Sequence, residues 1–219
     1  LAQIYNSNTP TLKSLLSDLP ITIRDYGIIP DNLEQTTIAV NEAMQDCDVL
    51  ISTAGVSVGD YDFLTTVIET LGQINHYKVA MKPGKPFVFG ELNKNLDKPV
   101  LYFGLPGNPL STVVGTLQFV IPALWQMSGA SVSEQPMPLT IKAKLISDIR
   151  KSPGRKDFQR GVLSRDETGH YQVECFSRQQ SHRVKQLSRA NCFIVLDKDS
   201  GNVAAGNDVV VQPFPWLHR

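Results

Sequence analysis

Apolar positions in the first half of the chain follow two different spacings. Residues 12–19 and 38–44 carry apolar side chains three and four positions apart, as on one face of a helix. A longer helix is predicted at residues 110–126. Short apolar runs between these segments predict strands at residues 21–23, 49–51, 77–81, 87–89 and 100–103. Strands that alternate with helices favour an α/β domain, with a parallel or mixed sheet and helices on both faces.

The spacing changes after residue 128. Residues 129–138 are rich in small and polar side chains and hold two prolines, which is typical of a linker. Alternating apolar positions then predict short strands at residues 139–145, 158–163, 171–175, 192–196 and 209–211. Such strands between turn-rich segments indicate a small all-β barrel or sandwich. We therefore expect an α/β domain at residues 1–128, a linker at 129–138 and a β-barrel domain at 139–219.

Two helix starts are marked by capping residues. Asn8 and Thr9 are suited to cap a helix that has Pro10 in its first turn. Asp31 stands three residues before Glu34, which is the spacing of a capping box. We therefore expect Asp31 to cap the second helix.

Charge and cysteine content exclude several classes of protein. Lys plus Arg and Asp plus Glu are equal, at 21 each, so no global field favours nucleic acid or an acidic membrane, and any anion site must be local. Cys47, Cys175 and Cys192 are widely separated, which indicates neither a disulfide framework nor a zinc site and fits a reducing cytoplasm. No apolar run is expected to span a membrane, and no signal peptide is recognised.

Three loops that follow predicted strands have unusual compositions. The first, at residues 53–62, holds two glycines, Ser57, Asp60 and Asp62. The second is KPGKP at residues 82–86, and the third is GLPGNP at residues 104–109, which leads directly into a helix. In an open α/β sheet, such loops line the crevice in which ligands bind.

Their chemistry suits a phosphorylated ligand. Glycines allow backbone N–H groups to approach an anion, and a helix start adds a positive dipole end. Lys82 and Lys85 supply point charges, while Asp60 and Asp62 provide oxygen ligands for a cation such as Mg²⁺. Taken singly, each motif has a structural alternative: a rigid turn for KPGKP, a strand-to-helix connection for GLPGNP, and a helix cap for Asp60. The ligand site is inferred from their occurrence at one predicted edge of the sheet.

The second domain offers a less specific signal. Several arginines, among them Arg155 and Arg160, fall in or near loops around Ser181 and His182. An ordinary solvated surface and a surface for an anionic ligand are both consistent with this pattern.

An ordered set of motifs resembles the molybdopterin molybdenumtransferases, the family that includes the bacterial MoeA enzyme and the E domain of gephyrin. In the first half, the set comprises IYNSN (4–8), GIIPD (27–31), GVSVGDYD (55–62), KPGKP (82–86) and GLPGNP (104–109). In the second half, it comprises SPGR (152–155), DFQRG (157–161), SH (181–182) and NCF (191–193). Each motif alone is weak, but their common order is specific.

The resemblance implies a molybdopterin-binding domain, a C-terminal β-barrel and a reaction. The family cleaves the phosphoanhydride of adenylated molybdopterin, releases AMP and delivers molybdate to the dithiolene sulfurs with the help of Mg²⁺. By motif match, the catalytic residues are expected to be Asp31, Asp62, Lys78 and Lys82; the spacing of the two loop carboxylates makes Asp62 and Asp60 the expected metal ligands. The expected substrate-binding residues are Gly55, Ser57, Gly59, Asp60, Lys85, Pro106, Gly107, Asn108, Pro109, Arg160 and Ser181. A homodimer that shares its site between subunits and a molybdopterin adenylyltransferase partner are also implied.

Two features depart from the family pattern. Ala54 stands where the family usually has a glycine. The strand and acidic motif that precede residues 4–5 in the family, and two further domains upstream, have no counterpart in this sequence. We therefore expect a C-terminal portion of a longer protein, without the first strand of its sheet.

Such a portion is expected to fold only within a longer chain or with partner contacts, because a missing strand exposes a sheet edge and apolar helix faces. Equal melting temperatures for this segment and for a full-length version would contradict this prediction.

The alternative functions are a non-catalytic molybdopterin-binding module and a scaffolding module of the same fold. The β segment with its DFQRG motif argues against a stand-alone adenylyltransferase, which lacks such a module.

Overall fold

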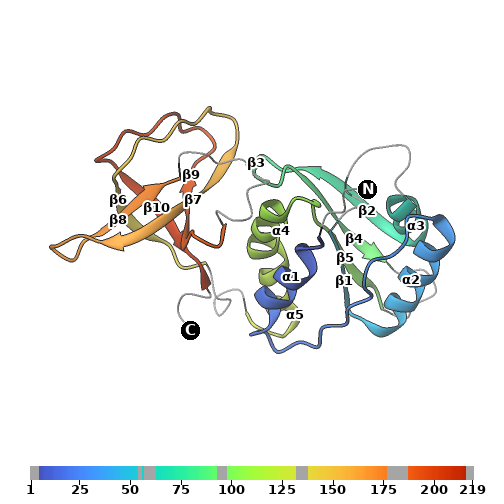
Figure 1. Ribbon diagram of the computed structural model, residues 1–219. Coiled ribbons are helices and arrows are strands. Elements are labelled where there is room, and N and C mark those ends of the chain that lie inside the picture. The colour runs from blue at the N-terminus through green and yellow to red at the C-terminus, as the bar shows by residue number, and fades with distance from the viewer. Residues whose placement is uncertain are drawn as a thin grey trace. The chain divides into compact units, whose positions relative to one another are not determined.

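A computed structural model describes residues 5–53, 56, 63–92, 98–131, 138–176 and 187–215 (Figure 1). The chain forms two compact units. Unit 1 comprises Leu1–Val79 and Gly84–Asn108, and unit 2 comprises Ala80–Pro83 and Pro109–Arg219. This division differs from the predicted domain limits in its placement of residues 80–83 and 109–128, and those limits stay a prediction.

A four-stranded mixed sheet forms the centre of unit 1. Its strands are β1 (Val49–Ser52), β2 (Gly72–Lys78), β4 (Pro86–Leu92) and β5 (Val100–Gly104), in the spatial order β1-β5-β4-β2. β1 and β5 run parallel, whereas β4 is antiparallel to both β5 and β2. The predicted mixed sheet is therefore confirmed.

Helices lie on both faces of this sheet, as predicted. Figure 1 shows α2 (Leu33–Asp46) and α3 (Phe63–Leu71) on one face and α1 (Asn8–Leu16) on the other. Apolar side chains from α2 and α3 pack on β4 and β5, because buried apolar area is the main favourable term in folding. The members of this core are Val40, Met44, Val56, Val67, Ile68, Leu71, Val88, Leu92, Val100 and Tyr102.

Three strand predictions for unit 1 need correction. Residues 21–23 form neither strand nor helix, and Ile23 is 40% exposed. The strand predicted at 77–81 instead begins at Gly72, directly after α3, and ends at Lys78. Residues 49–51 were expected to be buried on both faces, but β1 is only half-buried because it pairs with β5 alone at the edge of the described sheet.

The helix caps also differ from the prediction. At α1, the side-chain Oδ1 of Asn6 accepts hydrogen bonds from the backbone N–H groups of Asn8 and Thr9, at 3.1 and 3.2 Å. At α2, Asn32 is the cap, and its Oδ1 accepts from the Gln35 N–H at 2.9 Å. Asp31 therefore lies outside the helix and is exposed.

The two neighbouring side chains at the start of α2 should respond differently to substitution. Asn32→Ala is expected to lower the free energy of unfolding by about 1 kcal/mol, because an orphan N–H of the first turn loses its acceptor. Asp31→Ala should leave stability within about 0.5 kcal/mol, as for an exposed surface position. Urea unfolding of the two variants beside the parent chain measures both effects. A larger loss of stability in Asp31→Ala than in Asn32→Ala would contradict the assignment of the cap to Asn32.

A continuous helical segment opens the larger part of unit 2. It consists of α4 (Pro109–Gly115), the π-helical stretch η1 (Thr116–Val120) and α5 (Ile121–Met127). Pro122 lies in the first turn of α5; its ring has no N–H and would clash with a carbonyl in an unbroken α-helix. The wider π-helical turn just before it accommodates this ring.

This segment corrects the expectation about apolar runs. Pro109–Met127 has 19 residues and a mean hydropathy of 1.3, so by length and composition alone it matches a membrane-spanning helix. However, 56% of its apolar window is buried inside the protein, and core helices of globular proteins meet the same criteria.

The second half of unit 2 is a closed β-barrel. Its strands are β6 (Ile141–Leu145), β7 (Lys156–Arg165), β8 (Tyr171–Cys175), β9 (Cys192–Leu196) and β10 (Asp208–Pro213). They follow the order β7-β8-β6-β10-β9, and pairing of β9 with β7 closes the ring. Closure removes the free edges of the sheet. The barrel is thus confirmed over the sandwich, and a short strand, β3 (Met81–Lys82), runs parallel beside β7.

Candidate functional site

The loops singled out in the first half leave from one edge of the unit 1 sheet. Ser52, at the end of β1, is in register with Gly104, at the end of β5. Because β4 is antiparallel, its start lies at the same edge: Val88 is opposite Gly104, and Pro86 is opposite Lys78 at the end of β2. The register therefore places the start of the first loop and the GLPGNP loop at one edge, as the sequence predicted, and adds Lys78, which the loop pattern did not single out.

The GLPGNP loop is packed against the end of β1. The Leu105 N–H donates to the Ser52 carbonyl oxygen at 2.9 Å, and the Ser52 and Tyr102 hydroxyls are 2.7 Å apart. A Cβ at Gly107 would lie 3.3 Å from the Thr53 carbonyl oxygen, which is a tight contact. The backbone of the GLPGNP loop thus lies directly against the backbone at the end of β1, as expected for a loop that presents N–H groups to a ligand.

Asn8 ties α1 to the same loop. Its side-chain Nδ2 donates to the Gly107 carbonyl oxygen at 2.9 Å, while its Oδ1 is buried and has no hydrogen-bond partner among the described residues. Sequence reasoning took this residue only for a helix cap. A hydrogen bond between positions 99 residues apart leaves no signal in the local pattern, so sequence reasoning missed it.

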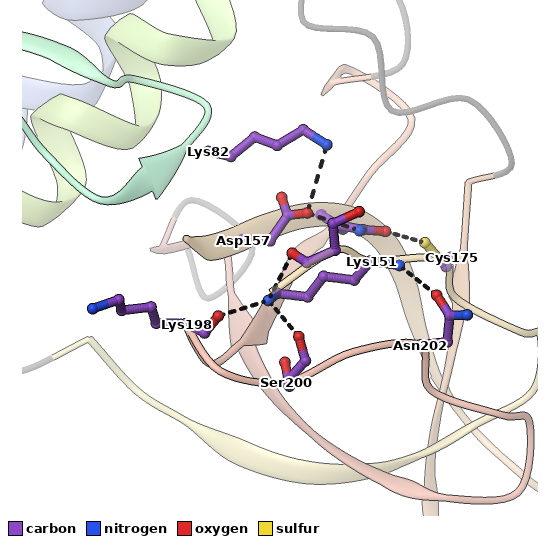
Figure 2. Close-up of polar contacts among 9 residues, drawn as sticks. Lys82, Lys151, Asp157, Cys175, Lys198, Ser200 and Asn202 are labelled. Carbon is purple, nitrogen blue, oxygen red and sulfur yellow. Dashed lines mark hydrogen bonds and ion pairs between the residues drawn. The ribbon is translucent and has the colours of Figure 1, made fainter. Parts of the chain in front are cut away.

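The KPGKP loop divides its lysines between the two units. The Val79 N–H donates to the Lys85 carbonyl oxygen at 2.8 Å, and Gly84 is buried with a φ of 98°, a region that favours glycine. Lys78 and Lys85 are exposed in unit 1. Lys82 belongs to β3 in unit 2, where its Nζ lies 3.8 Å from Oδ2 of Asp157 (Figure 2).

Asp157 is a buried carboxylate that the sequence did not single out. Only 6% of its side chain is exposed, and the Gln159 amide donates to its Oδ2 at 3.1 Å. The Cys175 thiol in turn donates to Oε1 of Gln159 at 3.2 Å (Figure 2). This chain of contacts offsets the cost of burying the carboxylate beside Lys82.

The remaining predicted site residues are found in different environments. In the GLPGNP loop, Pro106 is buried, Gly107 is exposed, and Asn108 and Pro109 are half-buried. Arg160 is fully buried in unit 2, where it has interaction partners within the protein, so in this arrangement its guanidinium is shielded from solvent. Six predicted residues lie outside the described residues: Gly55, Ser57, Gly59, Asp60, Asp62 and Ser181.

No metal centre is assembled by the described part of the chain. Within residues 5–53, 56, 63–92, 98–131, 138–176 and 187–215, no three His, Cys, Asp or Glu side chains are grouped to hold an ion. The predicted metal ligands Asp60 and Asp62 fall in the first loop, outside these ranges.

Two of the cysteines, Cys47 and Cys192, have thiols with raised pKa values. Burial raises the pKa of the Cys47 thiol, and it raises the pKa of Cys192 to about 12. The thiolate is the nucleophilic form, so these two thiols are not activated for catalysis.

Cys192 should make stability depend on pH above its ordinary pKa of 9.0. The folded state favours the neutral thiol, so this contribution is fully present below pH 9.0 and is lost as the pH rises toward about 12. We expect the free energy of unfolding to fall between pH 9 and 10.5, and to fall less steeply in Cys192→Ala. Denaturant unfolding across this range tests the difference, and parallel pH curves for the two proteins would rule it out.

Comparison with known families accounts for both halves of the chain. A family model described as a probable molybdopterin binding domain matches residues 1–126, and one described as the MoeA C-terminal region (domain IV) matches residues 142–214. The chain belongs to the MoeA family. The second match, in the barrel, separates this MoeA chain from proteins that carry the molybdopterin binding domain alone.

Individual relatives agree with this assignment. The chain is 39% identical over 215 residues to a molybdopterin molybdenumtransferase from Haemophilus influenzae, covering 98% of this chain and 52% of the relative. It is 31% identical to gephyrin from Dictyostelium discoideum, covering 94% of this chain and 32% of gephyrin. A crystal structure of a molybdopterin biosynthesis MoeA protein from Pyrococcus horikosii shares the fold, with a TM-score of 0.75 at 23% identity, over 96% of this chain and 48% of that one. This MoeA chain thus spans about half the length, or less, of these relatives.

Proposed function

We propose that the protein acts in molybdenum cofactor biosynthesis as a molybdopterin molybdenumtransferase. In this reaction, the phosphoanhydride of adenylated molybdopterin is cleaved, AMP leaves, and molybdate is delivered to the dithiolene sulfurs. The observation that carries the proposal is the register of the unit 1 sheet, by which the ends of β1, β2 and β5 and the start of β4 meet at one edge. Family membership supplies the pterin and the molybdate.

The proposed roles follow from charge and position. Lys78 and Lys85 are exposed near this edge, and ammonium groups stabilise the negative charge that develops on phosphate oxygens. Lys82 is proposed as the third cation, and Asp31 and Asp62 as the acidic site residues. Release of Asp31 from a capping role, which Asn32 fulfils, supports its assignment. Phosphoanhydride cleavage of this kind requires positioning and charge stabilisation rather than a covalent nucleophile.

Mg²⁺ fits the donor set of the first loop. Magnesium is commonly bound by one or two carboxylates together with substrate phosphates, and Asp60 and Asp62 supply such carboxylates. We propose these two residues as its ligands. When bound, the ion neutralises charge on the phosphoanhydride oxygens.

The same proposal includes partners and a compartment. A homodimer is proposed in which Arg160 and Ser181 complete the site of the other subunit; because Arg160 is buried in this arrangement, its part in that site requires a rearrangement of unit 2. A molybdopterin adenylyltransferase is proposed to supply the adenylated substrate. A cytoplasmic location is proposed from the spacing of the cysteines.

The decisive experiment measures AMP release from adenylated molybdopterin in the presence of Mg²⁺, with and without molybdate. It is run on this chain and on a version that spans the full length of its relatives. Molybdate-stimulated release that is lost in Asp62→Asn is the expected result for the longer protein. Pterin binding without AMP release by either protein would instead support a non-catalytic binding or scaffolding module, for which the similarity to gephyrin is the relevant observation.

A further inference from the structure

Unit 2 contains a pocket with a strong excess of positive charge. Its volume is about 420 Å³, and it lies where the segment before β7 meets the loop between β9 and β10. Four cationic side chains line it, together with one carboxylate and one amide: Lys82, Arg150, Lys151, Arg155, Asp157 and Asn202. In the sequence, Arg155 stood out as one of several arginines near loops and as the last residue of the SPGR motif, with no anion site assigned to it.

The single carboxylate of the pocket does not balance these cations. Asp157 already accepts a hydrogen bond from Gln159 at 3.1 Å and lies 3.8 Å from the ammonium of Lys82. Arg150 and Arg155 are exposed on the pocket wall, and no ion pair joins them to the described carboxylates. Two guanidinium groups are thus available to an anion in solution.

Lys151 adds a buried charge to the pocket. The residue is 7% exposed, and its ammonium donates to the carbonyl oxygens of Ser200 at 2.8 Å, Lys198 at 3.3 Å and Ser152 at 3.5 Å (Figure 2). Among the described residues, these contacts involve carbonyl dipoles and no carboxylate. A buried cation of this kind raises the local potential, because charges act more strongly where water is excluded.

The same residue fixes the orientation of the pocket amide. The backbone N–H of Lys151 donates to Oδ1 of Asn202 at 3.0 Å (Figure 2). With its oxygen engaged in this way, the Asn202 amide has its Nδ2 group as its remaining polar group, and Nδ2 is a donor. The pocket therefore combines a fixed amide donor with planar guanidinium groups, which match the geometry of oxyanions.

We propose that this pocket binds a tetrahedral oxyanion, either a free inorganic anion or the phosphoryl group of a larger ligand. Arg150, Arg155 and Nδ2 of Asn202 are the direct contacts. Lys82 also lines the pocket, and the buried ammonium of Lys151 raises the positive potential inside it. All of these groups belong to unit 2, so the site is formed by the barrel unit itself. Lys82 is shared with the site of the proposed activity, but the direct contacts Arg150, Arg155 and Asn202 are not among the residues proposed for that activity, so their binding of an anion is tested independently of it.

The test is calorimetric titration of the chain with inorganic phosphate at constant ionic strength. Arg155→Gln and Arg150→Gln are each expected to weaken phosphate binding about ten-fold or more, as for the loss of a charged hydrogen bond. Arg189→Gln is the matched control, because Arg189 is an exposed arginine of the same unit outside the pocket, and it should bind phosphate as the parent does. Unchanged binding in both pocket variants, equal weakening in the control, or no binding by the parent chain would each overturn the proposal.

A second titration, with phenyl phosphate, separates the two sources of the anion. Tighter binding than inorganic phosphate would indicate a pocket for an esterified phosphoryl group, and weaker binding would indicate a pocket for the free anion. In Arg155→Gln, the difference in affinity between phenyl phosphate and inorganic phosphate should disappear. If this difference is retained, the two ligands bind elsewhere on the chain and the proposal is wrong.

Discussion

Gly90→Ala is expected to lower the free energy of unfolding by about 3 kcal/mol, because overpacking at a rigid position is costly. Gly90 lies in β4, between β2 and β5, opposite Ile74 and Tyr102. An added Cβ would overlap the backbone oxygen of Gln73 and lie 2.6 Å from Cα of Ile74. These are backbone atoms of a paired strand, so relief requires opening the β2–β4 ladder.

Gly201→Ala is the matched control for this substitution. A Cβ at Gly201 meets no atom within 4 Å, and its φ is not in the region reserved for glycine. We expect its stability to change by less than about 0.5 kcal/mol. Urea unfolding followed by circular dichroism gives both values, and similar losses in the two variants would show that β4 adjusts without opening the sheet.

The apolar pattern of the sequence predicted where most strands of unit 1 lie, but not where each strand begins and ends. The apolar runs at residues 87–89 and 100–103 identified β4 and β5, because a central strand that is covered on both faces of its sheet needs apolar side chains on both faces. The run at 21–23 has a similar composition but forms no strand, since composition does not reveal whether a pairing partner exists. β2 begins at Gly72 within a polar stretch, where pairing with β4 overrides local propensity.

The candidate site shows the same division between local and long-range information. Loop composition predicted that the loops after residues 52 and 104 would lie at one edge, and strand register bears this out, whereas Lys78 was named by the family resemblance alone. The cap of α2 was assigned one residue too early, because Asp31 and Asn32 are both good caps and only backbone geometry separates them.

Contacts between distant residues escaped the sequence altogether. The hydrogen bond from Asn8 to Gly107, the ion pair of Lys82 with Asp157, and the carbonyl cage around Lys151 join residues that the chain folds together. The family resemblance named Arg160 as a site residue, but nothing in its motif indicates that the side chain is fully buried.

Lys78→Gln is expected to reduce kcat/KM for AMP release about 100-fold or more, the range seen when one group that stabilises developing charge is removed. Lys78 lies at the end of β2 and is exposed near the loop-bearing edge, so the loss should come without a loss of stability. The prediction rests on the proposed activity and is measured in a version of the protein that spans the length of its relatives.

Lys98→Gln provides the control for charge alone. Lys98 belongs to the same unit, its side chain is 82% exposed, and it forms an ion pair with Asp48 at 3.2 Å on the surface. Both variants lose one positive charge, but only Lys78 lies at the end of β2, opposite Pro86 of the KPGKP loop. Equal activities for the two variants would show that Lys78 has no role in the site. A loss of activity in Lys78→Gln alone, with an unchanged unfolding midpoint, would support a contact between its ammonium group and the reacting phosphate.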